Sequence, residues 1–205
     1  MSDGPAPEPA PAADGATAAQ PVLSLALVSM MHEVHAHSGA VYLLSPDEPV
    51  LEMAVHAGMP RAFAAPWERV GLSAPLPVAD AVRERRLVWV GGEDDMARSY
   101  PRIAVVLPYP FALAALPVAT ERQVYGAVFV TWPGGHPPEL SDAERDHLRA
   151  ACERLALRLE RSAPRHRTSG PGRTRRRPRW PEPRRWRRRW AWSRRPDWCP
   201  GCRTA

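Results

Sequence analysis

Phe111-Ala-Leu-Ala-Ala-Leu-Pro-Val118 is a short apolar run that ends at a polar turn, Thr120-Glu-Arg-Gln123, and leads into a second run, Val124-Tyr-Gly-Ala-Val-Phe-Val-Thr-Trp132. β-Branched and aromatic residues suit a pleated surface, so the two runs predict a pair of strands joined by the turn. Ser141-Asp-Ala-Glu144 then has the S-x-x-E form of a capping box, in which the hydroxyl and the carboxylate bind free N–H groups at a helix start. We therefore expect strand, turn, strand, loop and a long amphipathic helix that ends near Arg161.

The N-terminal half of the sequence predicts the rest of one domain. From Val22 to about Ala36, apolar residues recur at the i, i+3, i+4 spacing of an amphipathic helix. Two apolar runs, Ser38–Leu44 and Val50–Ala57, flank a Pro-containing turn and predict a β-hairpin. The remaining expected elements are a short helix interrupted by a proline, a second helix, a strand and a third helical segment, at residues 60–69, 77–85, 87–90 and 93–100.

Charge divides the chain into unlike parts. Residues 1–161 contain 13 Arg and 20 acidic residues, whereas residues 162–205 contain 15 Arg and 2 acidic residues. The high isoelectric point therefore comes from the C-terminal tail alone. We assign residues 1–21, rich in Pro and Ala, to a disordered leader, residues 22–162 to the folded domain, and residues 163–205 to a disordered tail rich in Arg, Trp and Pro.

The cysteine count and the apolar runs indicate the cellular compartment of the protein. Three cysteines do not make a disulfide framework, which favours a reducing environment. The apolar run Val22–Met31 lacks the basic segment that precedes a signal sequence, and it is too short to span a bilayer as a helix. We expect a cytoplasmic protein that does not insert into a membrane.

Several pieces of the chain resemble GAF domains, the small-molecule sensor modules of signalling proteins, and occur in the order that the family has: Ala40-Val-Tyr-Leu-Leu44, Leu51-Glu-Met-Ala-Val-His-Ala-Gly58, Pro77-Val-Ala-Asp-Ala-Val82, Tyr100-Pro101 and Leu116-Pro117-Val118. The resemblance covers roughly residues 22–162. It implies an α+β fold with a central antiparallel sheet of five to six strands and helices on both faces, the first and last helices packing together. Leu87-Val-Trp-Val-Gly91 is similar to GAF domains of high-GC bacteria, which often precede metal-dependent serine/threonine phosphatase domains.

The resemblance also implies a function. It predicts a non-catalytic sensory or regulatory domain that couples a small ligand or a partner to an output domain of phosphatase or kinase type, absent from this chain. It implies dimerisation of two copies through the first and last helices. It places five residues near a ligand pocket, for which ordinary core and rim packing is the other interpretation: His56, Trp67, Trp89, Tyr100 and Tyr109. The sequence identifies neither the ligand nor a cofactor.

Enzymatic and cofactor chemistry finds little support in the sequence. The chain contains no lysine, which excludes a Walker A phosphate loop and lysine Schiff bases, and which argues against the Asn-Lys-x-Asp signature of GAF domains that bind cyclic nucleotides. His32, His35 and His37 are close in sequence, but no further ligand is spaced to complete a metal site, so we expect none. Cys152 lies on the apolar stripe of the last helix and is expected in the core, rather than as a bilin attachment or as part of a cysteine cluster for sulfoxide reduction.

The tail suggests an alternative function, that of a nucleic-acid-binding regulator. Arginine neutralises phosphates and tryptophan stacks on unpaired bases. The residues that carry this alternative are Arg175, Arg176, Arg177, Trp180, Arg187, Arg188, Arg189 and Trp190. A second interpretation is that the Arg, Trp and Pro codons of GC-rich DNA have been read out of frame, so that the tail replaces a real downstream domain. The sequence leaves both interpretations open.

Overall fold

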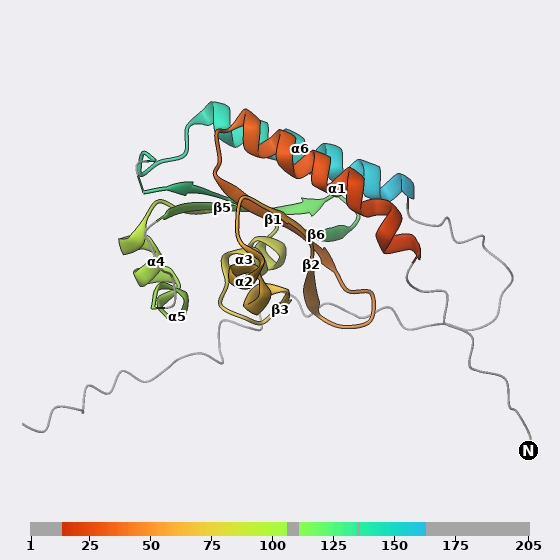
Figure 1. Ribbon diagram of the computed structural model, residues 1–205, viewed down its shortest axis with the longest axis horizontal. Coiled ribbons are helices and arrows are strands. Elements are labelled where there is room, and N and C mark those ends of the chain that lie inside the picture. Colours follow the sequence, from red (N-terminus) through yellow and green to blue (C-terminus); the bar gives the residue numbers. More distant parts are fainter. Residues whose placement is uncertain (1–13, 106–110, 135, 163–205) are drawn as a thin grey trace, which may run out of the picture. The chain divides into compact units, whose positions relative to one another are not determined.

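One antiparallel sheet of six strands forms the centre of the fold (Figure 1). The structure is a computed structural model that describes residues 14–105, 111–134 and 136–162. The strands lie in the order β3-β2-β1-β6-β5-β4, so β1 and β6 occupy the middle of the sheet. Their bounds are Ser38–Leu44 (β1), Val50–Ala57 (β2), Arg69–Gly71 (β3), Val88–Val90 (β4), Phe111–Ala119 (β5) and Val124–Pro133 (β6). The expected α+β class and sheet of five to six strands are confirmed.

The two predicted hairpins, β1–β2 and β5–β6, are both present. They are joined by the pairing of β1 with β6, in which Ser38 lies opposite Thr131 and Val41 lies opposite Val128. No turn links these two strands in the sequence, so their register is set by the side chains that each buries on the two faces of the sheet.

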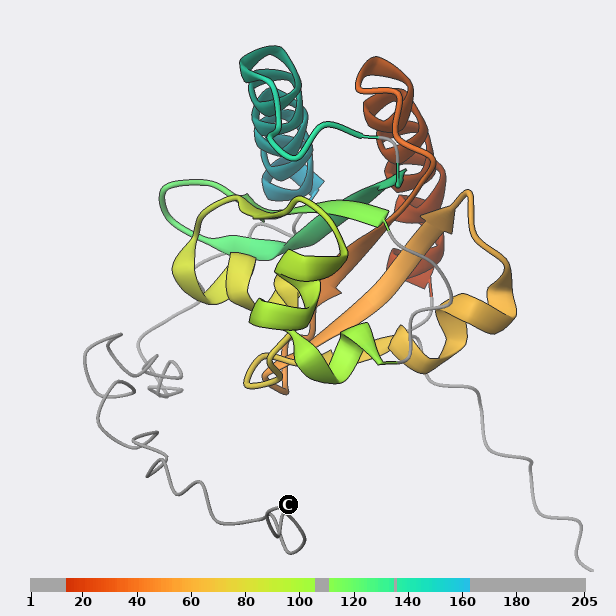
Figure 2. The same cartoon turned by 90° about the vertical axis from the view of Figure 1, so that its left-hand side faces the viewer.

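Alternation along the central strands sends side chains to two separate cores. In β5, Ala112, Ala114 and Leu116 belong to one hydrophobic cluster, whereas Leu113 and Ala115 belong to the other. Because successive side chains of a strand point to opposite faces, a strand that is apolar at nearly every position needs cover on both sides. Figures 1 and 2 show helices on both faces of the sheet.

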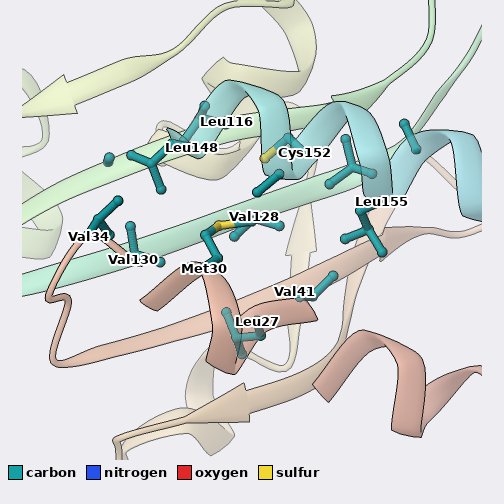
Figure 3. Packing of buried hydrophobic residues seen from close by; sticks show 14 of the residues in the cluster. Leu27, Met30, Val34, Val41, Leu116, Val128, Val130, Leu148, Cys152 and Leu155 are labelled. Atoms are coloured by element: carbon teal, nitrogen blue, oxygen red, sulfur yellow. The ribbon is translucent and has the colours of Figure 1, made fainter. Parts of the chain in front are cut away.

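The first and last helices, α1 (Asp14–Glu33) and α6 (Asp142–Ser162), cover one face of the sheet (Figures 1 and 2). Leu27 and Met30 of α1 and Leu148 and Leu155 of α6 are buried against the strands, as Figure 3 shows. Cys152 lies in the same cluster, as its place on the apolar stripe predicted. The expected packing of the first helix beside the last is confirmed.

The bounds of α1 differ from the expected helix over 22–36. The helix begins at Asp14, so residues 14–21, which we assigned to the leader, are helical. This segment contains three alanines, the residue with the highest helix propensity. At the other end α1 stops at Glu33, and His35 adopts a left-handed φ of 54°, a conformation that terminates helices.

Four short helices and a 3₁₀ turn cover the opposite face: α2 (Arg61–Ala64), η1 (Ala65–Trp67), α3 (Pro77–Glu84), α4 (Glu93–Ser99) and α5 (Pro101–Ala104). α3 packs on β5 and β6. The expected helix over 60–69 is shorter, because Pro66 lies within the 3₁₀ turn η1 and the chain then enters the edge strand β3, which the sequence did not predict.

The predicted capping box is present at the start of α6. The Ser141 hydroxyl accepts a hydrogen bond from the Glu144 backbone N–H at 3.3 Å, and a Glu144 carboxylate oxygen accepts from the Ser141 backbone N–H at 2.9 Å. Each residue therefore satisfies a backbone donor that the helix leaves unpaired.

Candidate functional site

A cavity of about 90 Å³ lies between the sheet and the short helices of the α3 face. Strands β1, β2, β5 and β6 form one wall, and η1, α3, α4 and α5 supply residues to the other. The lining residues are Ser38, Tyr42, Met53, Met59, Phe63, Trp67, Val70, Leu76, Pro77, Val78, Met96, Ile103, Phe111, Leu113, Phe129 and Thr131. A cavity with apolar walls and few polar groups is the usual form of a small-molecule site.

The lining concentrates the aromatic and thioether side chains of the chain. All three phenylalanines, Phe63, Phe111 and Phe129, line the cavity. Three of the six methionines do so as well, and their unbranched side chains adapt to irregular space. No Asp, Glu, Arg or His side chain is among the described residues that line it.

Two hydroxyl groups form the polar part of the wall. Ser38 Oγ and Thr131 Oγ1 lie 2.6 Å apart, and the two residues are 7% and 8% exposed. They are the only buried polar residues in the part of the chain that the structure describes. They face each other because Ser38 and Thr131 are paired across β1 and β6.

The polar pair lies at the point where α1 meets the sheet. The Thr131 backbone oxygen accepts a hydrogen bond from the His37 N–H at 2.8 Å, in the turn between α1 and β1. The next residue, Trp132, donates from Nε1 to the Val34 carbonyl just beyond the end of α1, also at 2.8 Å. Adjacent residues of β6 therefore contact the cavity and the end of α1.

Tyr42 uses its own hydroxyl within the cavity wall. Its Oη donates to the Trp67 carbonyl at 3.0 Å, which fastens η1 to the central strand β1. Burial raises the pKa of Tyr42 above its ordinary value, so the phenol stays neutral and remains a donor at physiological pH.

Tyr100 stabilises the segments beside the cavity and is not part of the lining. Its hydroxyl donates to Asp80 of α3 at 2.8 Å, and Arg83 forms an ion pair with the same carboxylate. Burial, followed by the hydrogen bond to Asp80, raises the pKa of Tyr100. The Arg83 guanidinium also donates to the Ala74 carbonyl at 3.0 Å, so this group ties α4 and the loop before α3 to α3.

The structure separates the five residues that the resemblance placed near one pocket. Trp67 lines the cavity, and Tyr100 belongs to the hydrophobic cluster beside it. His56 is exposed on β2, and Trp89 packs against the cluster under α1 and α6, on the other side of the sheet. Tyr109 lies outside the described residues. The role of these residues in ligand binding stays a prediction.

Trp89 belongs to an aromatic group with Trp132 and His136. The ring centroids of Trp89 and Trp132 lie 5.3 Å and 4.8 Å from that of His136, and Trp89 Nε1 donates to the Pro138 carbonyl at 2.8 Å. His136 Nε2 lies 3.0 Å from a Glu144 carboxylate oxygen. These contacts hold the loop before α6 against the sheet, which gives Trp89 a structural role.

The candidates for metal and cofactor chemistry are apart from the cavity. His32, His35 and His37 are all exposed near the end of α1, and no group of three His, Cys, Asp or Glu side chains gathers in a metal-binding arrangement within the described ranges. Burial raises the pKa of the Cys152 thiol to about 12, so it is not a nucleophile. The eight tail residues of the nucleic-acid alternative lie outside the described residues.

Sequence reasoning missed Ser38, Thr131 and the phenylalanines. A signal for part of the set was present, because alternate residues of Val124–Trp132 share a face, which groups Ala127, Phe129 and Thr131. The pairing of Ser38 with Thr131 joins residues 93 positions apart and depends on strand register, which no local pattern gives.

No helix in the described part of the chain is long and apolar enough to cross a bilayer.

Comparisons with known proteins identify the fold. No family model and no curated protein matches the sequence. Among solved structures, a GAF domain/HD domain protein from Geobacter sulfurreducens superposes with a TM-score of 0.60 at 21% identity, over 73% of this chain and 96% of that one. The second GAF domain of DevS from Mycobacterium smegmatis superposes with a TM-score of 0.55 at 16% identity, over 73% of this chain and 98% of that one. The GAF domain of an Acinetobacter phosphoenolpyruvate-protein phosphotransferase superposes with a TM-score of 0.53 at 17% identity, over 70% of this chain and 82% of that one.

The superpositions cover 82% to 98% of these solved chains, although few residues are identical. The part of the chain that the structure describes therefore has the fold of a GAF domain.

Proposed function

We propose that this chain is a non-catalytic sensory domain of a cytoplasmic signalling system, which binds a small molecule in the cavity and passes the signal through α1 and α6 to an output domain. The observation that carries the proposal is the direct connection at Thr131 and Trp132, where one residue lines the cavity and the next is hydrogen-bonded to the chain that ends α1. Solved GAF structures belong to an HD domain protein and to a phosphotransferase, which supports an output of signalling type, such as a kinase or phosphatase.

The proposed mechanism is a shift between two packings of α1 against α6. A ligand that contacts Ser38 or Thr131 acts on the turn after α1, because the His37 N–H is bonded to the Thr131 carbonyl. A ligand shifts such an equilibrium only by its different affinity for the two states. The central strands β1 and β6 line the cavity with one face and contact α1 and α6 with the other, so they connect the ligand to the helix pair.

The helical layer also offers a surface for a second copy of the chain. Large apolar side chains are exposed on α1 at Val22, Leu25 and Val28, and on α6 at Leu157. The α1 positions recur every three residues, so they form a stripe along the helix. We propose that two copies bury these residues against each other and that the helix pair transmits the signal within this dimer.

Ligand binding is tested by thermal unfolding of the full chain with a panel of neutral, anionic and cationic small molecules. A compound that binds the folded state raises the unfolding midpoint. We expect Leu113→Trp, which puts an indole into the cavity, to abolish the increase, and Leu87→Trp, at a half-buried position that packs on the other face, to retain it. An increase of equal size in both variants would place binding elsewhere.

Dimerisation is tested by sedimentation equilibrium. We expect Leu25→Asp and Leu157→Asp to shift the chain to monomers, because each puts a charge into the apolar surface. Val105→Asp is the matched control, since Val105 is 86% exposed and follows α5 on the other side of the sheet. A monomeric wild-type chain, or loss of the dimer with Val105→Asp alone, contradicts this interface.

A further inference from the structure

The chemistry of the cavity wall limits the kind of molecule that it accepts. We propose that the cavity selects a small, uncharged ring compound that carries one hydrogen-bond acceptor, and that the Ser38–Thr131 pair binds this acceptor. The inference rests on the proposed function, since it names the class of ligand for the same cavity.

The absence of charge in the described lining argues against ionic ligands. A carboxylate or ammonium group that moves from water to an apolar cavity loses hydration free energy. Only a counter-ion or several hydrogen bonds compensate for this cost. The lining residues offer neither an Arg nor an acidic side chain, and the Tyr42 hydroxyl is already bonded to the Trp67 carbonyl. An uncharged ligand avoids this cost.

The shape and size of the wall favour a single ring. Phe63, Trp67, Phe111 and Phe129 line the space, and aromatic side chains pack well on planar rings. A protein cavity of about 150 Å³ holds benzene. The volume here is about 90 Å³, so a ring of similar size enters only as the methionine side chains adjust.

The hydroxyl pair has one hydrogen left to donate. Ser38 and Thr131 together carry two hydroxyl hydrogens, and their mutual bond uses one of them, whichever residue is the donor. Within the described part of the chain, the accepting hydroxyl has no other partner for its own hydrogen. The pair therefore presents one donor to an acceptor in the cavity.

The test uses pyridine and benzene, which have the same shape and differ in one ring acceptor. The full chain is labelled with ¹³C at the methionine methyl groups. Pyridine, uncharged at neutral pH, is expected to shift the signals of Met53, Met59 and Met96, which line the cavity, more strongly than that of Met30, which belongs to α1 and is buried on the other face of the sheet. Affinities for pyridine and benzene are then read from the same signals.

Two variants isolate the hydroxyl donor. In Thr131→Val the Ser38 hydroxyl remains and is free to donate, so the ratio of pyridine to benzene affinity is retained. In the double variant Ser38→Ala/Thr131→Val no donor is left, and the ratio falls roughly three- to tenfold, the effect of one neutral hydrogen bond. Unchanged benzene binding shows that the double variant is folded, and replacing both partners by apolar groups of similar shape has little cost.

Each other outcome contradicts the inference. An unchanged ratio in the double variant means that the hydroxyl pair does not recognise the acceptor. If benzoate shifts the signals of the cavity methionines and binds with higher affinity than pyridine, the proposal of an uncharged ligand is wrong, but the cavity remains a ligand site. No shift with pyridine overturns the ring class, whereas the proposed function is decided separately by the unfolding panel and Leu113→Trp.

Discussion

Glu144 joins three groups at the start of α6. Its carboxylate accepts hydrogen bonds from the Ser141 N–H and hydroxyl, at 2.9 Å and 2.6 Å, and lies 3.0 Å from His136 Nε2. Burial by itself raises the pKa of Glu144, but the hydrogen bonds from Ser141 and His136 outweigh it, and the pKa is lowered from its ordinary value of 4.5. The ionised form is therefore the one that the fold stabilises.

This pKa shift predicts a pH-dependent stability. Because the folded-state pKa is depressed, the contribution of Glu144 is present above pH 4.5 and is lost as the pH falls through the folded-state pKa. Gln keeps the hydrogen-bonding pattern of a capping box but not the charge, so we expect Glu144→Gln to lower the free energy of unfolding by about 0.3–1 kcal/mol at pH 7, the effect of a negative charge at a helix start, and by progressively less below pH 4.5. Urea denaturation across this pH range measures the difference.

The exposed neighbour Glu139 supplies the control for this prediction, since Glu139→Gln removes a charge from the same loop without touching the capping box. A Glu144→Gln difference that stays constant with pH would mean that the carboxylate does not stabilise the helix start.

Cys152 is predicted to be inert in the folded domain. The thiol is buried among Leu148, Leu155 and the strands, and burial raises its pKa to about 12, so almost no thiolate forms near pH 8. Alkylation by iodoacetamide, followed by mass spectrometry of the peptide that contains Cys152, is expected to be slow in native buffer and fast in guanidinium chloride. Equal rates in the two solutions would contradict the burial of this side chain.

At the scale of the elements, α1 combines a buried face and an exposed apolar stripe. Leu27 is 1% exposed and Leu25 is 64% exposed, although the two lie on the same two turns. We expect Leu27→Ala to lower the free energy of unfolding by about 2–5 kcal/mol, because it leaves a cavity in a packed core. Leu25→Ala is expected to change it by less than about 0.5 kcal/mol in dilute solution and to weaken the dimer.

Urea denaturation at two protein concentrations measures both effects, since the stability of a dimer depends on concentration and that of a monomer does not. Similar losses for the two alanine variants would contradict the orientation of α1.

The sequence predicts the long, periodic elements well and the short ones poorly. β1, β2, β5 and β6 are each mostly apolar over seven or more residues, and α6 carries an apolar stripe and a capping box. β3 has three residues and exists because Val50 and Leu51 offer it a sheet edge, which is a tertiary effect. The sequence does not predict the start of α1, because residues 14–21 directly follow a segment in which Pro alternates with Ala and Glu, a composition typical of a linker.

The candidate site follows the same division. Trp67, which the family resemblance places near a pocket, lines the cavity, whereas Trp89 packs on the other face of the sheet, because the resemblance does not say to which face of the short strand β4 its side chain points. Ser38 and Thr131 are ordinary strand residues in the sequence, and only the register of β1 on β6 brings them to one cavity.

At the scale of the whole domain, the central strands contribute side chains to both hydrophobic clusters, the one under α1 and α6 and the one on the α3 face. Tyr42 and Thr131 face the cavity, while their neighbours Val41 and Val130 contact the helical layer. Close-packed interiors transmit displacement instead of absorbing it. A ligand in the cavity is therefore expected to change the packing of α1 and α6.

Hydrogen exchange measured by mass spectrometry on the full chain tests this expectation most directly, with and without pyridine at the concentration that saturates the Met53 shift. We predict slower exchange around the cavity and an altered exchange rate in peptides of α1 and α6 across the sheet, with both changes absent in Leu113→Trp. Changes confined to the cavity side, with α1 and α6 exchanging as in the free protein, would contradict the proposal that the cavity controls the helical layer.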